Sequence, residues 1–177
     1  MDYLNITAFS QLVIADRPNA IAHVRGGSEH PLLSGTVLFY QAAGGCLVVA
    51  EIFNLPYTVK SEEGDSRPVG PFYGFHIHEG RECGSGSPPN AFSAAGGHLN
   101  PQNVPHPMHM GDMPSLLGSR GYAYMSFFTD KFTPEEVVGR TVIIHANADD
   151  YHTQPAGNAG ARIGCGVITR VTRETEL

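Results

Sequence analysis

Seven short apolar runs follow one another along the chain, and each is bounded by Gly, Pro, Asn or Asp. The runs are rich in Val, Ile, Phe and Tyr, residues that favour strands over helices. The segments between them show no pattern of the long helical crossovers of an α/β fold. They predict strands at residues 19–26, 34–41, 45–55, 72–79, 121–130, 141–147 and 165–171.

Local signals between the runs agree with an all-β chain. The sequence AAGG at 42–45 predicts a hairpin turn. One short helix is expected after Thr133, which can cap it, with Pro134 in the first turn and Glu136 completing a capping box. We therefore expect an antiparallel sandwich or Greek-key barrel of about eight strands. Residues 1–18 are interpreted as an N-terminal extension, and 19–177 as a single domain.

Two segments lack the strand pattern and are expected to be long loops. The first spans residues 80–120 and is rich in Gly and Pro, and the second spans 148–164. Loops of such length in a compact domain are usually functional or disordered. The first contains three histidines and one aspartate and the second contains one histidine and two aspartates, so they are the first place to search for chemistry.

Composition and charge exclude several classes of partner. The net charge of −6 disfavours nucleic acid and anionic membranes, because phosphate binding needs a basic face. No apolar run approaches the ~20 residues that cross a bilayer. The N-terminal segment lacks a basic, then apolar, signal pattern, so a cytoplasmic location is expected. Three cysteines allow at most one disulfide and one free thiol, and Cys46 in an early strand is expected to be a buried apolar residue.

The sequence GFHIHEG places two histidines on one predicted strand. Positions i and i+2 of a strand face the same side, so His76 and His78 project together. Phe75 and Ile77 then face the opposite side, which in a barrel is the core. The histidines are expected on the outer wall, where the first long loop can cover them.

That loop supplies three more histidines and a carboxylate, His98, His106, His109 and Asp112. Nitrogen ligands with one carboxylate suit a tetrahedral zinc ion. His145 ends the predicted strand 141–147. A single histidine at a strand end is more often a hydrogen-bonded structural residue, and we interpret His23, His30 and His152 in that way. Asp112 alone would read as a turn former, but the clustering of ligand types favours a metal site.

Five segments together resemble the copper/zinc superoxide dismutase family, in the order in which that family has them. They are GFHIHEG, GGHLNP, HMGD, VIIHANADD and GNAGARIGCGVI, and the resemblance runs from about Leu33 to Ile168. It implies a copper ion and a zinc ion as cofactors. It implies copper ligands at His76, His78, His98 and His145, and zinc ligands at His98, His106, His109 and Asp112.

The same resemblance assigns roles to residues around the metals. His98 would bridge both ions and carry a proton, and Asp149 would hydrogen-bond to a ligand of each. Arg162 would lie beside copper and attract an anion. Cys83 and Cys165 would form a disulfide, although two reduced thiols are the ordinary expectation for a cytoplasmic protein.

The implied function is the dismutation of superoxide to oxygen and hydrogen peroxide, with superoxide as substrate and a homodimer as a possible assembly. The alternatives are a non-catalytic zinc- or copper-binding protein on the same fold and a copper-delivery protein. The chain retains all the ligands and Arg162, which disfavours the first, and it lacks an exposed CxxC pair, which disfavours the second. Only two residues separate His106 from His109, a shorter spacing that is similar to some bacterial members.

Overall fold

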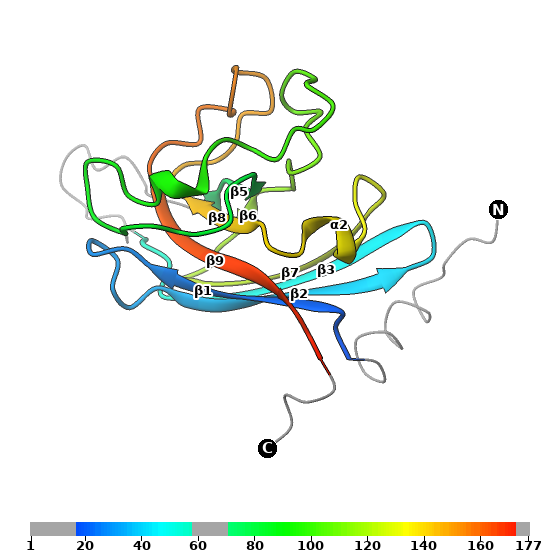
Figure 1. The fold of residues 1–177 in the computed structure, drawn as a ribbon. Coiled ribbons are helices and arrows are strands. Elements are labelled where there is room, and N and C mark those ends of the chain that lie inside the picture. Colours follow the sequence, from blue (N-terminus) through cyan, green and yellow to red (C-terminus); the bar gives the residue numbers. More distant parts are fainter. Residues whose placement is uncertain (1–16, 58–70, 173–177) are drawn as a thin grey trace.

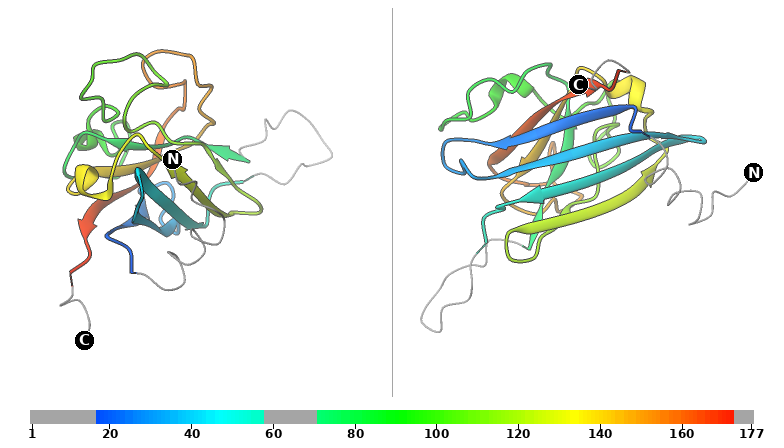
Figure 2. Two further views of the ribbon diagram at one scale, coloured as in Figure 1. Left: turned by 90° about the vertical axis from the view of Figure 1, so that its right-hand side faces the viewer. Right: turned by 90° about the horizontal axis from the view of Figure 1, so that it is seen from below.

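A computed structural model describes residues 17–57 and 71–172, and its central element is one curled antiparallel sheet (Figures 1 and 2). The strand order is β5-β8-β9-β1-β2-β3-β7. The all-β class is confirmed, with seven strands in this sheet against the expected eight or so. Their bounds are β1 (Ala20–Gly26), β2 (Ser34–Ala42), β3 (Gly45–Phe53), β5 (Phe75–His78), β7 (Tyr122–Thr129), β8 (Thr141–His145) and β9 (Arg162–Arg170).

Four smaller elements complete the described chain: β4 (Phe72–Tyr73), which pairs with β6 (Leu116–Leu117), the 3₁₀ turn η1 (Ser93–Ala95) and the helix α2 (Pro134–Val137). The predicted helix is confirmed: the Glu136 carboxylate accepts hydrogen bonds from the main-chain N–H and the hydroxyl of Thr133, both at 2.8 Å. Neither β6 nor η1 was predicted. The predicted extension 1–18 lies outside the described residues except for its last two.

The predicted strand 72–79 is split at Gly74. The N–H of Gly74 donates to the Asn147 carbonyl at 2.7 Å, and its carbonyl accepts from the His145 N–H at 2.8 Å. Those contacts connect Gly74 to the end of β8 and the loop that follows it, so β4 leaves to pair with β6 while β5 continues along β8. The predicted turn at 42–45 is confirmed, because β2 and β3 pair in register up to Ala42 and Gly45.

The core lies inside the curl of the sheet. Its buried side chains come from all seven strands and include Val24, Val37, Phe39, Val48, Ile52, Phe75, Ile77, Ala123, Val142, Ile144 and Ile168. Phe132, just before α2, joins them, with its ring centroid 6.4 Å from that of Phe39. Phe75 and Ile77 face the core as their alternation predicted, so β5 turns its two histidines to the other side.

Both long loops lie on one side of the sheet, next to β5 and β8 (Figures 1 and 2). One connects β5 to β7 and the other connects β8 to β9. The first loop leaves β5 and the second leaves β8, and these two strands are hydrogen-bonded neighbours in the sheet. Residues far apart in sequence therefore meet there. Within the described ranges, no helix is long and apolar enough to cross a membrane.

Candidate metal centre

The outer face of β5 is covered by the first long loop, which pairs with it at isolated positions. His76 lies opposite Asp112, and His78 lies opposite His98. Between them, Ile77 donates its N–H to the Gly111 carbonyl and accepts from the Leu99 N–H, both at 2.9 Å. A Cβ on Gly111 would lie 2.1 Å from the Ile77 oxygen, so only glycine allows this approach. His76 and His78 are 0% and 1% exposed as a result.

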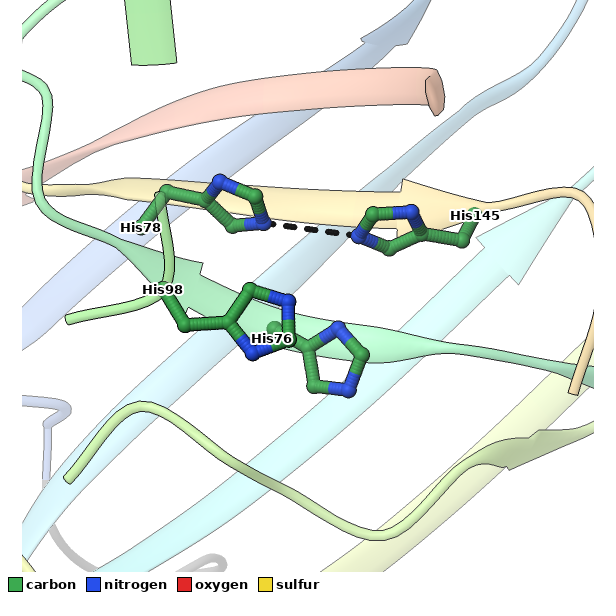
Figure 3. Close-up of side chains that lie close together, drawn as sticks. All are labelled: His76, His78, His98 and His145. Carbon is green, nitrogen blue, oxygen red and sulfur yellow. Dashed lines mark hydrogen bonds between the residues drawn. The ribbon is translucent and has the colours of Figure 1, made fainter. Parts of the chain in front are cut away.

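Four histidines form the first of two clusters, which we call the four-histidine group: His76, His78, His98 and His145 (Figure 3). One nitrogen of each ring lies within 4.8 Å of the corresponding nitrogen of the others. The pairing of β5 with β8 brings His145 near the β5 histidines, and β9 places Arg162 opposite His145 across the next strand pair. The four histidines come from three segments, β5, the first long loop and β8, which backbone pairing brings together.

Hydrogen bonds on the outer side of these rings determine where their lone pairs point. His78 Nδ1 lies 2.9 Å from the Gly96 carbonyl oxygen, and His145 Nδ1 lies 3.2 Å from that of Gly160. Carbonyl oxygens only accept, so each Nδ1 carries the ring hydrogen of the neutral form and each Nε2 presents a lone pair. Those two Nε2 atoms are 3.4 Å apart (dashed line in Figure 3), and with the ring hydrogens on Nδ1 neither can donate to the other. Converging lone pairs of this kind suit a cation.

A second cluster shares one histidine with the first, and we call it the Asp112 group: His98, His106, His109 and Asp112. The Asp112 carboxylate lies 2.7 Å from His98 Nδ1 through one oxygen, and 3.0 and 3.2 Å from the Nδ1 atoms of His106 and His109 through the other. The shared ring therefore turns Nδ1 to the Asp112 group. Its Nε2 is the nitrogen left for the four-histidine group.

Asp149 hydrogen-bonds to one histidine of each group, His76 and His106. Its carboxylate lies 2.7 Å from His76 Nε2 and 2.9 Å from His106 Nε2, and it accepts a further bond from the Tyr151 N–H at 2.7 Å. Burial raises the pKa of Asp149, but these hydrogen bonds outweigh it and hold the pKa well below the usual range. An ionised carboxylate accepts from both rings, so His76 and His106 keep their lone pairs on Nδ1.

Gly157 makes room for this carboxylate. A Cβ at position 157 would lie 1.8 Å from Asp149 Oδ1 and 2.8 Å from His106 Nε2, and the residue has a φ of 63°. Only glycine adopts that conformation at no steric cost while leaving the space empty. The first glycine of the GNAG sequence thus has a direct physical role at the site.

Among the described residues, four buried ring nitrogens make no hydrogen bond, although two of them lie near the Asp112 carboxylate: His76 Nδ1, His98 Nε2, His106 Nδ1 and His109 Nδ1. A buried polar atom without a partner costs free energy unless something satisfies it. All four belong to the two groups. The hydrogen bonds to Asp149 leave lone pairs on Nδ1 of His76 and His106, and the contact of His98 Nδ1 with Asp112 leaves its Nε2 for the four-histidine group. His109 Nδ1 faces the Asp112 carboxylate. The donor set therefore fits two metal ions bridged by His98.

Arg162 lies beside the four-histidine group at the wall of a cavity of about 590 Å³. Its guanidinium donates to the Phe92 carbonyl at 2.7 Å and to the Gly96 carbonyl at 2.5 Å. The Gly96 carbonyl is also the partner of His78 Nδ1, so one peptide unit connects the arginine to a histidine of the cluster. Cys83 and Cys165 form the expected disulfide, which ties the start of the first long loop to β9.

The remaining histidines lie outside both groups. His23 is exposed on β1, and His152 is exposed and contacts Asp150. His30 lines the same cavity as Arg162 without joining a cluster. Two contacts to the Asp112 group were not predicted, because they depend on tertiary structure alone. They come from Lys131 and Gln154, whose side chains hydrogen-bond to the main chain around His106 and His109.

Buried neutral histidines make the metal-free protein sensitive to acid. Burial and neighbouring positive groups lower the pKa of His145 to about 3 and that of His78 well below its usual value. In the unfolded chain both titrate near pH 6.5, so below that pH only the unfolded state takes up these protons. The contribution of these two histidines to the free energy of unfolding is therefore fully present above about pH 6.5. As the pH falls below that value toward the folded pKa, the free energy of unfolding decreases by ~1.4 kcal/mol per pH unit for each group.

Urea unfolding of the chelator-treated protein between pH 7 and pH 5 measures this effect. In that range carboxylates contribute little, because their unfolded pKa values lie near 4. A free energy of unfolding that does not change across the range would contradict the prediction.

Comparison with known proteins agrees with the geometry. Residues 33–168 match the family described as Copper/zinc superoxide dismutase (SODC). The chain is 35% identical to the Superoxide dismutase [Cu-Zn] of Deinococcus radiodurans over 78% of this chain and 79% of that one. It is 33% identical to that of Legionella pneumophila over 90% and 91% of the two chains. The structure resembles the Cu/Zn superoxide dismutase from Brucella abortus, with a TM-score of 0.67 and 26% identity, covering 84% of this chain and 98% of that one. The chain belongs to the copper/zinc superoxide dismutase family.

Proposed function

We propose that the protein converts superoxide and protons into oxygen and hydrogen peroxide, with copper in the four-histidine group and zinc in the Asp112 group. The observation that supports this most directly is the orientation of His98, whose two ring nitrogens face different groups. Four neutral imidazoles suit copper, which stands at the top of the divalent affinity order. Three imidazoles and one carboxylate suit tetrahedral zinc.

Bound copper would supply the one-electron redox chemistry, and zinc, which has none, would order the site. The protein's own residues supply substrate attraction and a proton site. Arg162 uses two N–H groups on main-chain carbonyls, and a guanidinium has five, so donors remain for a small anion. His98 Nε2 is buried and has no other partner, which makes it the atom that can hold a proton for the peroxide product.

Metal loading followed by a superoxide assay tests the function. The protein loaded with both metals is expected to contain one copper and one zinc per chain and to consume superoxide catalytically. The zinc-only form is its control and is expected to be inactive. A protein that takes up both metals in this ratio without consuming superoxide would instead be the non-catalytic metal-binding alternative.

Replacing Arg162 with alanine is expected to slow superoxide consumption about 10- to 100-fold, the value of one charge-assisted hydrogen bond to the substrate. Arg170→Ala is the matched control, because Arg170 lies at the far end of the same strand and pairs with Glu135 on the surface. Both variants lose one positive charge. Equal rates in the two variants would show that Arg162 acts only through net charge.

The homodimer rests on the family resemblance, and the cytoplasmic location rests on the N-terminal sequence. Both stay predictions.

A further inference from the structure

The ammonium of Lys131 contacts three main-chain carbonyls of the segment that contains two zinc ligands. Its Nζ lies 3.0 Å from the oxygen of Pro107 and 3.2 Å from those of His109 and Asp112. A lysine ammonium has three N–H donors and no acceptor, so three carbonyls satisfy it completely. All three belong to residues 107–112, a short stretch inside the first long loop.

Lys131 itself is held by a different part of the fold. It lies between β7 and α2, and its main-chain N–H donates to the Thr129 hydroxyl at 3.2 Å. Its neighbour Phe132 is 2% exposed and packs on Phe39 in the core. The ammonium therefore extends to the loop from a fixed point on the sheet, not from the loop it contacts.

The contacted residues direct their main chain to Lys131 and their side chains to the Asp112 group. The His109 Nδ1 atom lies 3.2 Å from the Asp112 carboxylate, while the carbonyls of both residues accept from Nζ. The His109 N–H also donates to that carboxylate at 3.0 Å. One ammonium thus binds the peptide units on either side of the tight turn that brings the two ligands together.

The other end of the segment is held separately by the second long loop. The Gln154 side-chain oxygen accepts from the His106 N–H at 3.0 Å, and its amide nitrogen donates to the His106 carbonyl at 2.7 Å. This contact holds only His106. The part that carries His109 and Asp112 contacts β5 and Leu99 through the main chain of Gly111, and Lys131 is its side-chain contact from outside the loop.

We propose that Lys131 is a positioning residue for zinc, which holds residues 107–112 in their metal-binding shape. The inference rests on the proposed function, since it takes the Asp112 group to be the zinc site. Ordering the ligands before binding lowers the entropic cost of binding, and outer contacts of this kind commonly change metal affinity 10- to 100-fold. The positive charge alone would act in the opposite direction, because it repels a cation. If Lys131 acts by ordering the ligands, its removal lowers the affinity for zinc; if it acts only by charge repulsion, its removal raises that affinity.

The test measures zinc affinity of the copper-free protein by competition with a chromophoric chelator, together with the visible spectrum of bound Co²⁺. In Lys131→Met the affinity for zinc is expected to fall about 10- to 100-fold, and the cobalt bands are expected to shift as the ligands lose their fixed geometry. Arg170→Met is the control, because it removes an exposed charge that pairs with Glu135. It is expected to leave affinity and spectrum unchanged.

Lys131→Arg keeps the charge but replaces three tetrahedral donors with a planar fork, so it is expected to weaken zinc binding and shift the cobalt bands to a smaller degree. It serves as the test if Lys131→Met does not fold. Unchanged or tighter zinc binding with an unchanged cobalt spectrum, in whichever variant is measured, would overturn the inference alone. Failure of the unmodified protein to take up zinc would overturn the proposed function as well.

Discussion

Replacing His78 with alanine is expected to lower superoxide consumption by at least about 100-fold while zinc binding is retained. Substitutions that only touch a ligand from outside already cost up to about 100-fold, and His78 belongs to the four-histidine group itself. Its ring is buried, and its orientation is fixed by the Gly96 carbonyl. Alanine would remove one of the two converging Nε2 lone pairs and leave His145 without its counterpart.

The Asp112 group does not include His78, so its affinity for zinc should stay close to that of the unmodified protein. Metal analysis after loading and a superoxide assay on the same samples measure both properties. His23→Ala is the matched control, since it removes an exposed imidazole on β1 outside both groups. Full activity in His78→Ala with one copper per chain would contradict the proposed copper site.

The local pattern of β5 was enough to place its side chains. Alternation along a strand sends Phe75 and Ile77 to one face and His76 and His78 to the other, and the structure has this arrangement. This prediction is possible because side chains alternate with the same period in every strand, whatever the strand pairs with. The split of the predicted strand at Gly74 could not be foreseen, because it depends on contacts with Asn147 and His145.

Which histidines meet is a different kind of question. His145 approaches His76 and His78 because β8 pairs with β5 in one register, and no local pattern encodes that pairing. The grouping could be predicted only from the resemblance of five segments to a known family. Lys131 illustrates what both approaches missed. Its partners are main-chain carbonyls, which every residue has, so nothing in the sequence around position 131 distinguishes it.

Removing the disulfide is expected to lower the free energy of unfolding by roughly 4 kcal/mol. Cys83 and Cys165 are 82 residues apart in sequence, and the chain-entropy model gives a value of this order for a loop of that length. The double variant Cys83→Ala/Cys165→Ala suits the test, because alanine adds no polar group to the cluster of Phe92, Ala95 and Ile143 around the bridge.

Cys46→Ala is the matched control for this stability measurement. Cys46 is a buried free thiol in the main core, so its removal deletes the same side chain without opening a bridge. Such a truncation is expected to cost about 1 kcal/mol. Urea unfolding of the three metal-free proteins under oxidising conditions compares the costs. A double variant within about 1 kcal/mol of Cys46→Ala would show that the bridge adds little to stability.

The bridge should also affect the function through Arg162. The carbonyls of Phe92 and Gly96, which hold the guanidinium, lie in the loop segment that the disulfide ties to β9. A looser segment would hold Arg162 less well, so Arg162→Ala should slow superoxide consumption less in the double variant than in the unmodified protein. A double-mutant cycle on the rate measures this coupling. Equal effects of Arg162→Ala in both backgrounds would show that the bridge stabilises the fold without positioning the arginine.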